Sequence, residues 1–228
     1  MVYCDRYPTK PARGAAWDPT VASNTTAEIT KLFRVNSDPE RAVLFYCYAV
    51  MSCEAYLEAF EPVLYVPSNP ERPFRVPVFA DQTVRQKLVE LGEKLAACEN
   101  FDITHPLADS IEAIWPKEVV EFELVGHSFR EAEGELELVG SCGERALVRG
   151  VSSAACTHRI AGHNVLDKWL RERRISYLRR TLRPNDLRDL MSVISRIERQ
   201  LLLLQEIAAL VSPLLRDPKL LVAPPKPE

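Results

Sequence analysis

The stretch RIAGHNVLDKWLRER, residues 159–173, carries the most structural information in this sequence. Gly162 suits a tight turn, and either Gly162 or Asn164 can begin a helix expected over residues 163–173. The preceding residues 157–161 are expected to form a short strand. The apolar residues of the helix share one face at helical spacing, which predicts packing on a sheet: Val165, Leu166 and Trp169. Basic side chains occupy the other face.

Upstream of this stretch, alternation of apolar and charged residues predicts a small sheet. Residues 119–125 and 133–139 alternate with the period of a half-buried strand. Gly140-Ser-Cys-Gly143 is typical of a hairpin turn and leads into a third strand at 144–149. The alternation places Glu133, Glu135 and Glu137 on one strand face, which we expect to be solvated.

Downstream, Pro184-Asn-Asp186 begins a long helix that Pro213 ends. Its apolar residues follow steps of three and four, which is the heptad spacing of a helix seam. The seam is expected to dock a neighbouring helix, either of this domain or of a partner subunit. We expect any helix-mediated association to involve five residues of this seam: Leu190, Ile194, Ile197, Leu201 and Leu204.

The N-terminal half is predicted to be helical. A helix should run from Ser37 to about Phe60, and a second from about Asp81 to Cys98, with the proline-rich connector 67–77 between them. The expected fold class is α+β, with N-terminal helices, a small central antiparallel sheet and a long C-terminal helix pair. The expected parts are an irregular arm (1–37), a folded domain (38–215) and a disordered tail (216–228). Within that domain we expect a helical part (38–115), a sheet (116–162) and C-terminal helices (163–213).

Composition is that of an ordinary globular protein. Of 228 residues 46% are hydrophobic and 27% charged, and the net charge is −3. The six cysteines form no C-x-x-C pair and no secretory segment opens the chain, so a reducing, cytoplasmic location is expected. No apolar run approaches the roughly 20 residues of a membrane helix.

No complete catalytic, metal or nucleotide site is recognisable. Neither glycine-rich nucleotide motif is present, and the serines after Gly150 lack the second glycine of a nucleophile elbow. The one metal candidate is Cys156 with His158 and His163, but zinc usually takes a fourth ligand and none is evident. We therefore assign no catalytic, cofactor-binding or metal-ligating residues, and keep an unrecognised site at these three residues as a remote alternative.

A basic segment favours contact with nucleic acid. Residues 166–183 hold seven basic and two acidic side chains, with Trp169 and Tyr177 between them. The planar guanidinium donates two hydrogen bonds at once and so suits phosphate. Trp169 is expected to pack in the core. The predicted DNA-binding residues are Lys168, Arg171, Arg173, Arg174, Arg179, Arg180 and Arg183.

Several short sequence motifs resemble those of the C-terminal specificity domain of type ISP restriction-modification enzymes, and they occur in the same order. Residues 165–173 resemble the family's V-L-x-x-W-L-x-x-R helix. Residues 44–60 are similar to the family's aromatic-rich helix. Residues 74–78 are similar to its R-I-P motif, and residues 91–95 to its L-G-x-x-L motif. The resemblance covers about residues 40 to 205. Ala161-Gly162-His163 departs from it, since two glycines and an aromatic are usual there.

The resemblance implies a non-catalytic domain that recognises double-stranded target DNA in a phage-defence system. An adenine methyltransferase or restriction subunit would act with it, in the same chain or in another. The methyltransferase loop N-P-P-[YF] is absent, and its nearest string, Ser68-Asn-Pro-Glu71, lacks the second proline and the aromatic. The chain is thus not expected to bind S-adenosylmethionine. The alternative is a repurposed protein–protein interaction module that pairs through its C-terminal helix and does not bind DNA.

Overall fold

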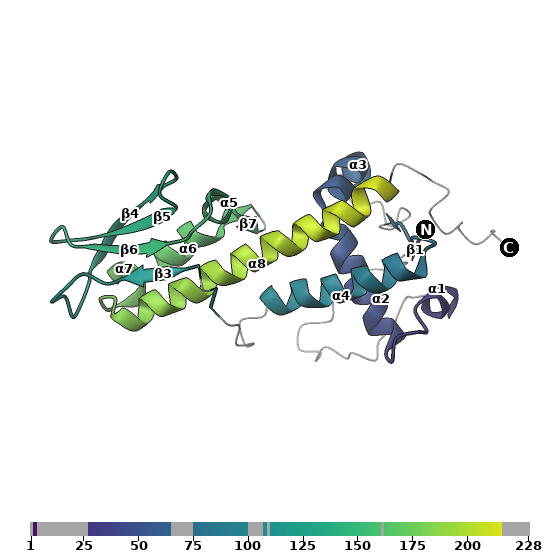
Figure 1. Ribbon diagram of the computed structural model, residues 1–228, viewed down its shortest axis with the longest axis horizontal. Coiled ribbons are helices and arrows are strands. Elements are labelled where there is room, and N and C mark those ends of the chain that lie inside the picture. The colour runs from purple at the N-terminus through teal and green to yellow at the C-terminus, as the bar shows by residue number, and fades with distance from the viewer. Residues whose placement is uncertain are drawn as a thin grey trace, which may run out of the picture. The chain divides into compact units, whose positions relative to one another are not determined.

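The computed structural model divides the chain into two compact units (Figure 1), which are treated separately below. Unit 1 comprises residues 1–97 and 203–228, and unit 2 comprises residues 98–202. The structure describes residues 2–3, 27–64, 75–99, 107–108, 110–160 and 162–215. The expected disordered tail, most of the irregular arm and most of the proline-rich connector lie outside the described residues.

Unit 1 is mainly helical. Its elements are β1 (Val2–Tyr3), α1 (Ala27–Leu32), α2 (Pro39–Met51), α3 (Glu54–Leu64), β2 (Arg75–Val76), most of α4 (Gln82–Glu99) and the part of α8 (Pro184–Leu214) from Leu203 onward. Strands β1 and β2 pair in antiparallel fashion. Helix α1 corrects the expectation that residues 1–37 are irregular throughout. The helix expected from Ser37 to Phe60 is in fact two helices, α2 and α3.

The break between α2 and α3 lies at Ser52 and Cys53. The Ser52 hydroxyl donates to the Tyr48 carbonyl at 2.8 Å, and the Cys53 amide donates to the Val50 carbonyl at 3.1 Å. The Tyr48 carbonyl also accepts from the Ser52 amide at 3.0 Å, so the last helical bond of α2 is made at Ser52, and the Cys53 amide turns to a carbonyl three residues earlier. Cys53 is buried, so the interruption directs a small apolar side chain into the core. The apolar pattern alone did not reveal this interruption.

The core of unit 1 is built around Tyr46, which is fully buried. Its hydroxyl donates to the Pro77 carbonyl at 2.8 Å and accepts from the Phe79 amide at 3.1 Å. The rings of Phe33 and Phe79 meet Tyr46 edge-on. Gly92 lets α4 approach α2 closely, because a Cβ atom there would collide with the Phe45 carbonyl.

Unit 2 contains the four-stranded sheet. Its strands are β3 (Glu112–Ile114), β4 (Leu124–Arg130), β5 (Glu135–Gly140) and β6 (Arg145–Arg149), in the antiparallel order β3-β6-β5-β4. The strands predicted at 133–139 and 144–149 correspond to β5 and β6. The strand predicted at 119–125 is displaced towards the C-terminus, since β4 begins at Leu124. Residues 116–121 instead form a loop in which Glu118 has a positive φ of 65°.

The fourth strand of the sheet differs from the one expected. It is β3, which pairs with β6 and lies in the part expected to be helical. Residues 153–160 hold the short helix α5 (Ser153–Thr157) and β7 (Arg159–Ile160). Among the described residues, strand β7 pairs with β8 (His163–Asn164) and with no other strand, and Gly162 at the turn has a φ of 80°. With these corrections the expected α+β class is confirmed.

One face of the sheet is apolar and is covered by helices (Figure 1). Leu136, Leu138 and Val148 form a core cluster with residues of α6 (Val165–Glu172) and α8 (Pro184–Leu214). The α8 residues in that cluster are Leu187, Leu190, Val193, Ile194 and Ile197. Trp169 packs against the cluster from α6, as expected.

The burial of α8 corrects the prediction of helix-mediated association. Leu190, Ile194 and Ile197 are 0%, 0% and 3% exposed, so they pack within their own unit. Leu201 and Leu204 are half-buried. Heptad spacing indicates an apolar stripe along a helix, but it does not indicate which element packs against that stripe.

The opposite face of the sheet carries a row of charges. Glu135 on β5 lies between Arg130 on β4 and Arg149 on β6, and Arg149 Nε donates to its carboxylate at 2.6 Å. Glu137 accepts from Arg130 at 2.9 Å and from Arg145 at 2.8 Å. Glu135 and Glu137 are 8% and 6% exposed. The expectation that this acidic face is solvated is therefore wrong for Glu135 and Glu137, because arginines from both neighbouring strands cover them, whereas Glu133 is exposed as expected.

Candidate nucleic-acid interface

Helix α6 is held in place by the residue that begins it. The Asn164 side chain accepts from the Asp167 amide at 2.8 Å, and its amide nitrogen donates to the Cys156 carbonyl at 2.6 Å. This cap satisfies the helix start and ties it to α5. Leu166 and Leu170 face the core. The opposite side of the helix is therefore set towards solvent.

A short turn follows α6 and carries the next basic residues. Helix α7 (Ile175–Leu178) is a single turn, and Arg179 ends it with a φ of 63°. Leu178 packs against the core cluster. After the turn, Leu182 forms an isolated bridge with Phe122, with amide–carbonyl distances of 2.7 and 2.9 Å. The turn is thus anchored on both sides.

Three of the seven predicted DNA-binding residues are engaged within the unit. The Arg173 guanidinium lies 4.4 Å from the centre of the Trp169 ring, which is a cation–π contact. Arg180 makes two hydrogen bonds of 2.7 Å to the Asp186 carboxylate. Arg183 lies 3.9 Å from a carboxylate oxygen of Glu121, and both side chains are largely exposed.

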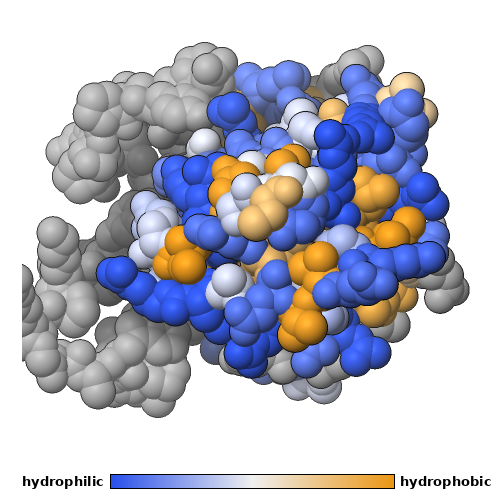
Figure 2. Space-filling model, turned by 90° about the vertical axis from the view of Figure 1, so that its left-hand side faces the viewer, coloured by the Kyte–Doolittle hydropathy of each residue, from blue (hydrophilic) through white to orange (hydrophobic). Residues whose placement is uncertain are grey.

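The other four predicted residues are exposed. Within the described part of the chain their side chains make no hydrogen bond or ion pair; the four residues are Lys168, Arg171, Arg174 and Arg179. Figure 2 shows that hydrophilic residues cover much of this end of unit 2, with small apolar areas between them. Unpaired guanidinium and ammonium groups on an anchored helix and turn are suited to phosphate oxygens.

Asp186 is a buried acid that binds two residues of the basic segment. It is 5% exposed, and besides Arg180 it accepts from the Arg183 amide at 2.7 Å. The hydrogen bonds from Arg180 lower the pKa of Asp186 below its ordinary value, against the opposing effect of burial. The sequence indicated Asp186 only as part of a helix start. Its pairing with Arg180 had no signal in the sequence, because a tertiary turn brings them together.

Sequence reasoning also left Tyr177 and Ile175 out of the predicted site. They are 63% and 44% exposed and lie on α7 among the unpaired basic residues. An aromatic residue within a basic segment was the available signal for Tyr177. Only the structure shows that Tyr177, and not Trp169, presents its ring to solvent.

The remote alternative of a metal or nucleophile site gains no support from the geometry. Burial raises the pKa of the Cys156 thiol to about 11 and lowers the pKa of His158. His163 is exposed on β8. Among the described residues, no group of three or more histidine, cysteine, aspartate or glutamate side chains is placed to hold a metal ion.

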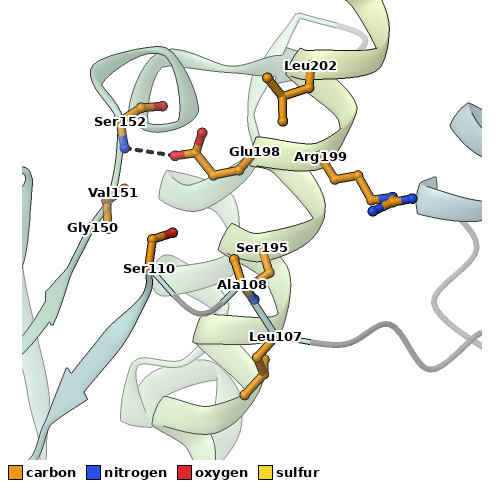
Figure 3. A pocket seen from close by; sticks show the side chains of 10 residues that line it. All are labelled: Leu107, Ala108, Ser110, Gly150, Val151, Ser152, Ser195, Glu198, Arg199 and Leu202. Carbon is orange, nitrogen blue, oxygen red and sulfur yellow. Dashed lines mark hydrogen bonds between the residues drawn. The ribbon is translucent and has the colours of Figure 1, made fainter.

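A hollow of about 520 Å³ lies beside α8 in unit 2 (Figure 3). Glu198 accepts from the Ser152 amide at 2.8 Å, and Ser195 accepts from the Ala108 amide at 3.0 Å. Arg199 extends away from Glu198 (Figure 3). Since Glu198 and Ser195 hold backbone amides and Arg199 points away, these three polar side chains do not converge on a common point in the hollow.

No helix among the described residues combines the length and the apolar character needed to cross a membrane.

Comparison with known proteins identifies related domains. The family model described as the type ISP C-terminal specificity domain matches residues 5–199. A nuclease-deletion mutant of the type ISP restriction-modification enzyme LlaGI, in complex with a DNA substrate mimic, is 19% identical with a TM-score of 0.51. The match covers 73% of this chain and 13% of that one. A search of curated proteins found no match.

Two further solved structures are similar to this chain. The ATP-dependent type ISP enzyme LlaBIII bound to DNA is 15% identical with a TM-score of 0.52, over 82% of this chain and 12% of that one. The DrdV–DNA complex is 17% identical with a TM-score of 0.50, over 82% of this chain and 19% of that one. At these identities the likeness shows a shared fold. The chain spans at most 19% of the length of these three chains.

Proposed function

The chain belongs to the type ISP C-terminal specificity domain family, and from this premise we propose that it recognises double-stranded DNA for a restriction-modification enzyme. The observation that carries the proposal is the set of unpaired basic side chains on α6 and the turn after it. Lys168, Arg171, Arg174 and Arg179 contact the phosphate backbone. The three solved relatives are DNA complexes or a complex with a DNA mimic, which supports the same role here.

The engaged arginines have other roles in this proposal. The contact between Arg183 and Glu121 is long and exposed, so Arg183 can exchange its carboxylate for a phosphate at little cost. Arg173 is held over Trp169 and Arg180 over Asp186, so these two shape the surface more than they bind DNA. The electrostatic contribution to binding then comes from four or five contacts instead of seven.

We assign recognition and not chemistry to this chain. The sequence lacks the methyltransferase loop and both glycine-rich nucleotide motifs, and the family is a specificity domain. An adenine methyltransferase or restriction subunit, in the same chain or in trans, supplies the reaction. The alternative role as a helix-pairing module loses its main support, because the seam residues Leu190, Ile194 and Ile197 are buried in their own unit.

The test is DNA binding as a function of salt. Fluorescence anisotropy with a labelled duplex should show affinity that falls steeply between 50 and 200 mM salt, because each neutralised phosphate contributes roughly 0.9 to the slope of log K against log salt. Four contacts give a slope of about −3.6. A double charge reversal, R171E/R174E, should abolish most binding.

Lys94 provides the matched control, since it is an exposed base on α4 in unit 1. K94E changes the net charge by two units, as the single reversal R171E does, and we expect K94E to retain most of the affinity while R171E loses more of it. Equal loss of binding in K94E and R171E would show that net charge alone governs binding. Failure of the natural chain to bind duplex DNA at 50 mM salt would overturn the proposal.

A further inference from the structure

The turn of residues 174–179, called the tip below, is unusually constrained for an exposed segment. Arg174 continues directly from α6, whose Leu170 is 1% exposed. Leu178 packs against the core cluster, and Leu182 bridges Phe122 just after the tip. The outer residues of the tip nevertheless remain open to solvent, including Tyr177 at 63% exposure.

The tip contains backbone strain at Arg179. Its φ of 63° lies in the left-handed region, which costs a residue with a side chain and is usually occupied by glycine. Such strain persists only where the surroundings impose it, and it is concentrated at functional sites. The strained residue is one of the four unpaired bases, and it lies between the exposed Tyr177 and the engaged Arg180.

A side-chain pair restrains the residue that follows Arg179, which itself ends α7 in the left-handed conformation. Arg180 is fixed by two hydrogen bonds of 2.7 Å to Asp186, and it also donates to the Thr181 carbonyl at 2.8 Å. Asp186 is itself held in the first turn of α8 by the Arg183 amide. A bidentate arginine–carboxylate pair has defined geometry as well as strength. It therefore fixes the backbone at the C-terminal end of the tip.

The two aromatic residues of the basic segment are not equivalent. Trp169 packs against the core and carries the Arg173 guanidinium over its ring, so little of the ring is available to a ligand. Tyr177 has no such cover among the described residues, and unpaired Arg174 and Arg179 flank it in the sequence. An uncharged aromatic side chain neutralises no phosphate, so its contact adds nothing to the salt dependence, whereas the arginines bind phosphate.

From these observations we propose that the tip is a pre-set DNA contact, in which Tyr177 packs against the sugars and bases of a groove and Asp186 acts as a positioning residue through Arg180. This inference rests on the proposed DNA binding and adds to it. It assigns the non-electrostatic contact to one side chain and gives a buried acid a role in binding an anion.

The sign of the Asp186 effect distinguishes positioning from simple electrostatics. D186N removes a negative charge close to the DNA surface, and on electrostatic grounds alone it should tighten binding. Positioning predicts the opposite, with a loss of affinity of about tenfold. The matched control is D189N, which removes the same charge from an exposed residue near Arg180 that does not hydrogen-bond to it. D189N should leave binding unchanged or tighten it.

The Tyr177 assignment is tested by salt dependence. Y177A should weaken binding about tenfold while the slope against salt stays as in the natural chain, because no charge is lost. R174A should instead lower the slope by roughly 0.9. Wild-type affinity in Y177A would overturn the role of Tyr177. Affinity of D186N equal to or above that of D189N would overturn the role of Asp186.

A readout without DNA keeps this inference separate from the proposed function. Limited digestion of the full chain with trypsin should cleave D186N after Arg179 or Arg180 several times faster than D189N, because the tip is no longer held. Equal rates would contradict positioning whether or not DNA is bound. R180K retains the charge but loses the bidentate geometry. It should weaken DNA binding in the same direction if D186N proves too unstable to assay.

Discussion

Glu135 and Arg149 face each other across β5 and β6, with the arginine Nε 2.6 Å from a carboxylate oxygen. Arg130 approaches the same carboxylate from β4 at 3.7 Å. The carboxylate is thus enclosed by two arginines on the face of the sheet that helices do not cover. Opposite charges on directly facing residues stabilise a given strand register.

Replacing Glu135 by glutamine should destabilise the protein by about 1–3 kcal/mol, because Arg149 loses a charge-assisted hydrogen bond. The free energy of unfolding in urea measures the effect. E133Q is the matched control, since Glu133 is exposed two residues away, and it should change stability by less than about 0.5 kcal/mol. Equal effects of the two substitutions would show that the ion pair adds nothing to stability.

Asp186 should make stability depend on pH. Hydrogen bonds from Arg180 lower its pKa below the ordinary value of 3.8, so the carboxylate is favoured in the folded state. Its contribution is therefore fully present near neutral pH and is lost as the pH falls from about 5 through the folded-state pKa. In urea melts, the advantage of the natural chain over D186N should be constant at pH 6–7 and shrink below about pH 5. A constant advantage down to pH 3 would contradict this cause.

Arg179 should tolerate glycine better than alanine. Its φ of 63° strains any residue with a Cβ atom, and glycine relieves that strain. R179G should be more stable than R179A by about 1 kcal/mol. Both variants lose the same guanidinium, so their DNA affinities allow the strain to be separated from the charge. Lower stability of R179G than of R179A would mean that the left-handed conformation is not maintained in solution.

Gly92 should resist substitution despite lying inside a helix. A Cβ atom there would collide with the Phe45 carbonyl oxygen, which cannot move without displacing α2. Overpacking of this kind costs about 1–3 kcal/mol and outweighs the gain in helix propensity from alanine. G92A should lower the melting temperature. E90A, at an exposed position of the same helix, should leave it nearly unchanged.

Sequence patterns predicted the elements whose burial follows a simple period. Strands β5 and β6 and helices α4 and α8 begin and end within about two residues of their expected bounds. Local interruptions of these periodic patterns were not predicted. The first long helix breaks at Ser52 and Cys53, and the loop with Glu118 displaces β4 towards the C-terminus. Strand β3 was missed because a three-residue strand is too short to show a period and is defined only by its partner β6.

The same division applies to the candidate site. The clustering of basic residues between Leu166 and Arg183 is a property of the sequence, since seven bases within a short segment need no fold to be recognised. Their separate roles are not. An arginine is engaged within the fold only where a second side chain contacts it, as Asp186 contacts Arg180 and Trp169 contacts Arg173.

By itself the sequence determined the family, the α+β class and the location of the basic segment. These depend on short sequence motifs, on local composition and on the period of apolar residues. The tertiary structure decided which charges are paired. It buried Glu135 beneath arginines, closed the heptad seam into the core and left four bases and Tyr177 exposed. The physical reason is that pairing and burial depend on which side chains meet in space. The packing of the sheet against its helices and the path of the turns decide this, even for residues as close in sequence as Arg180 and Asp186.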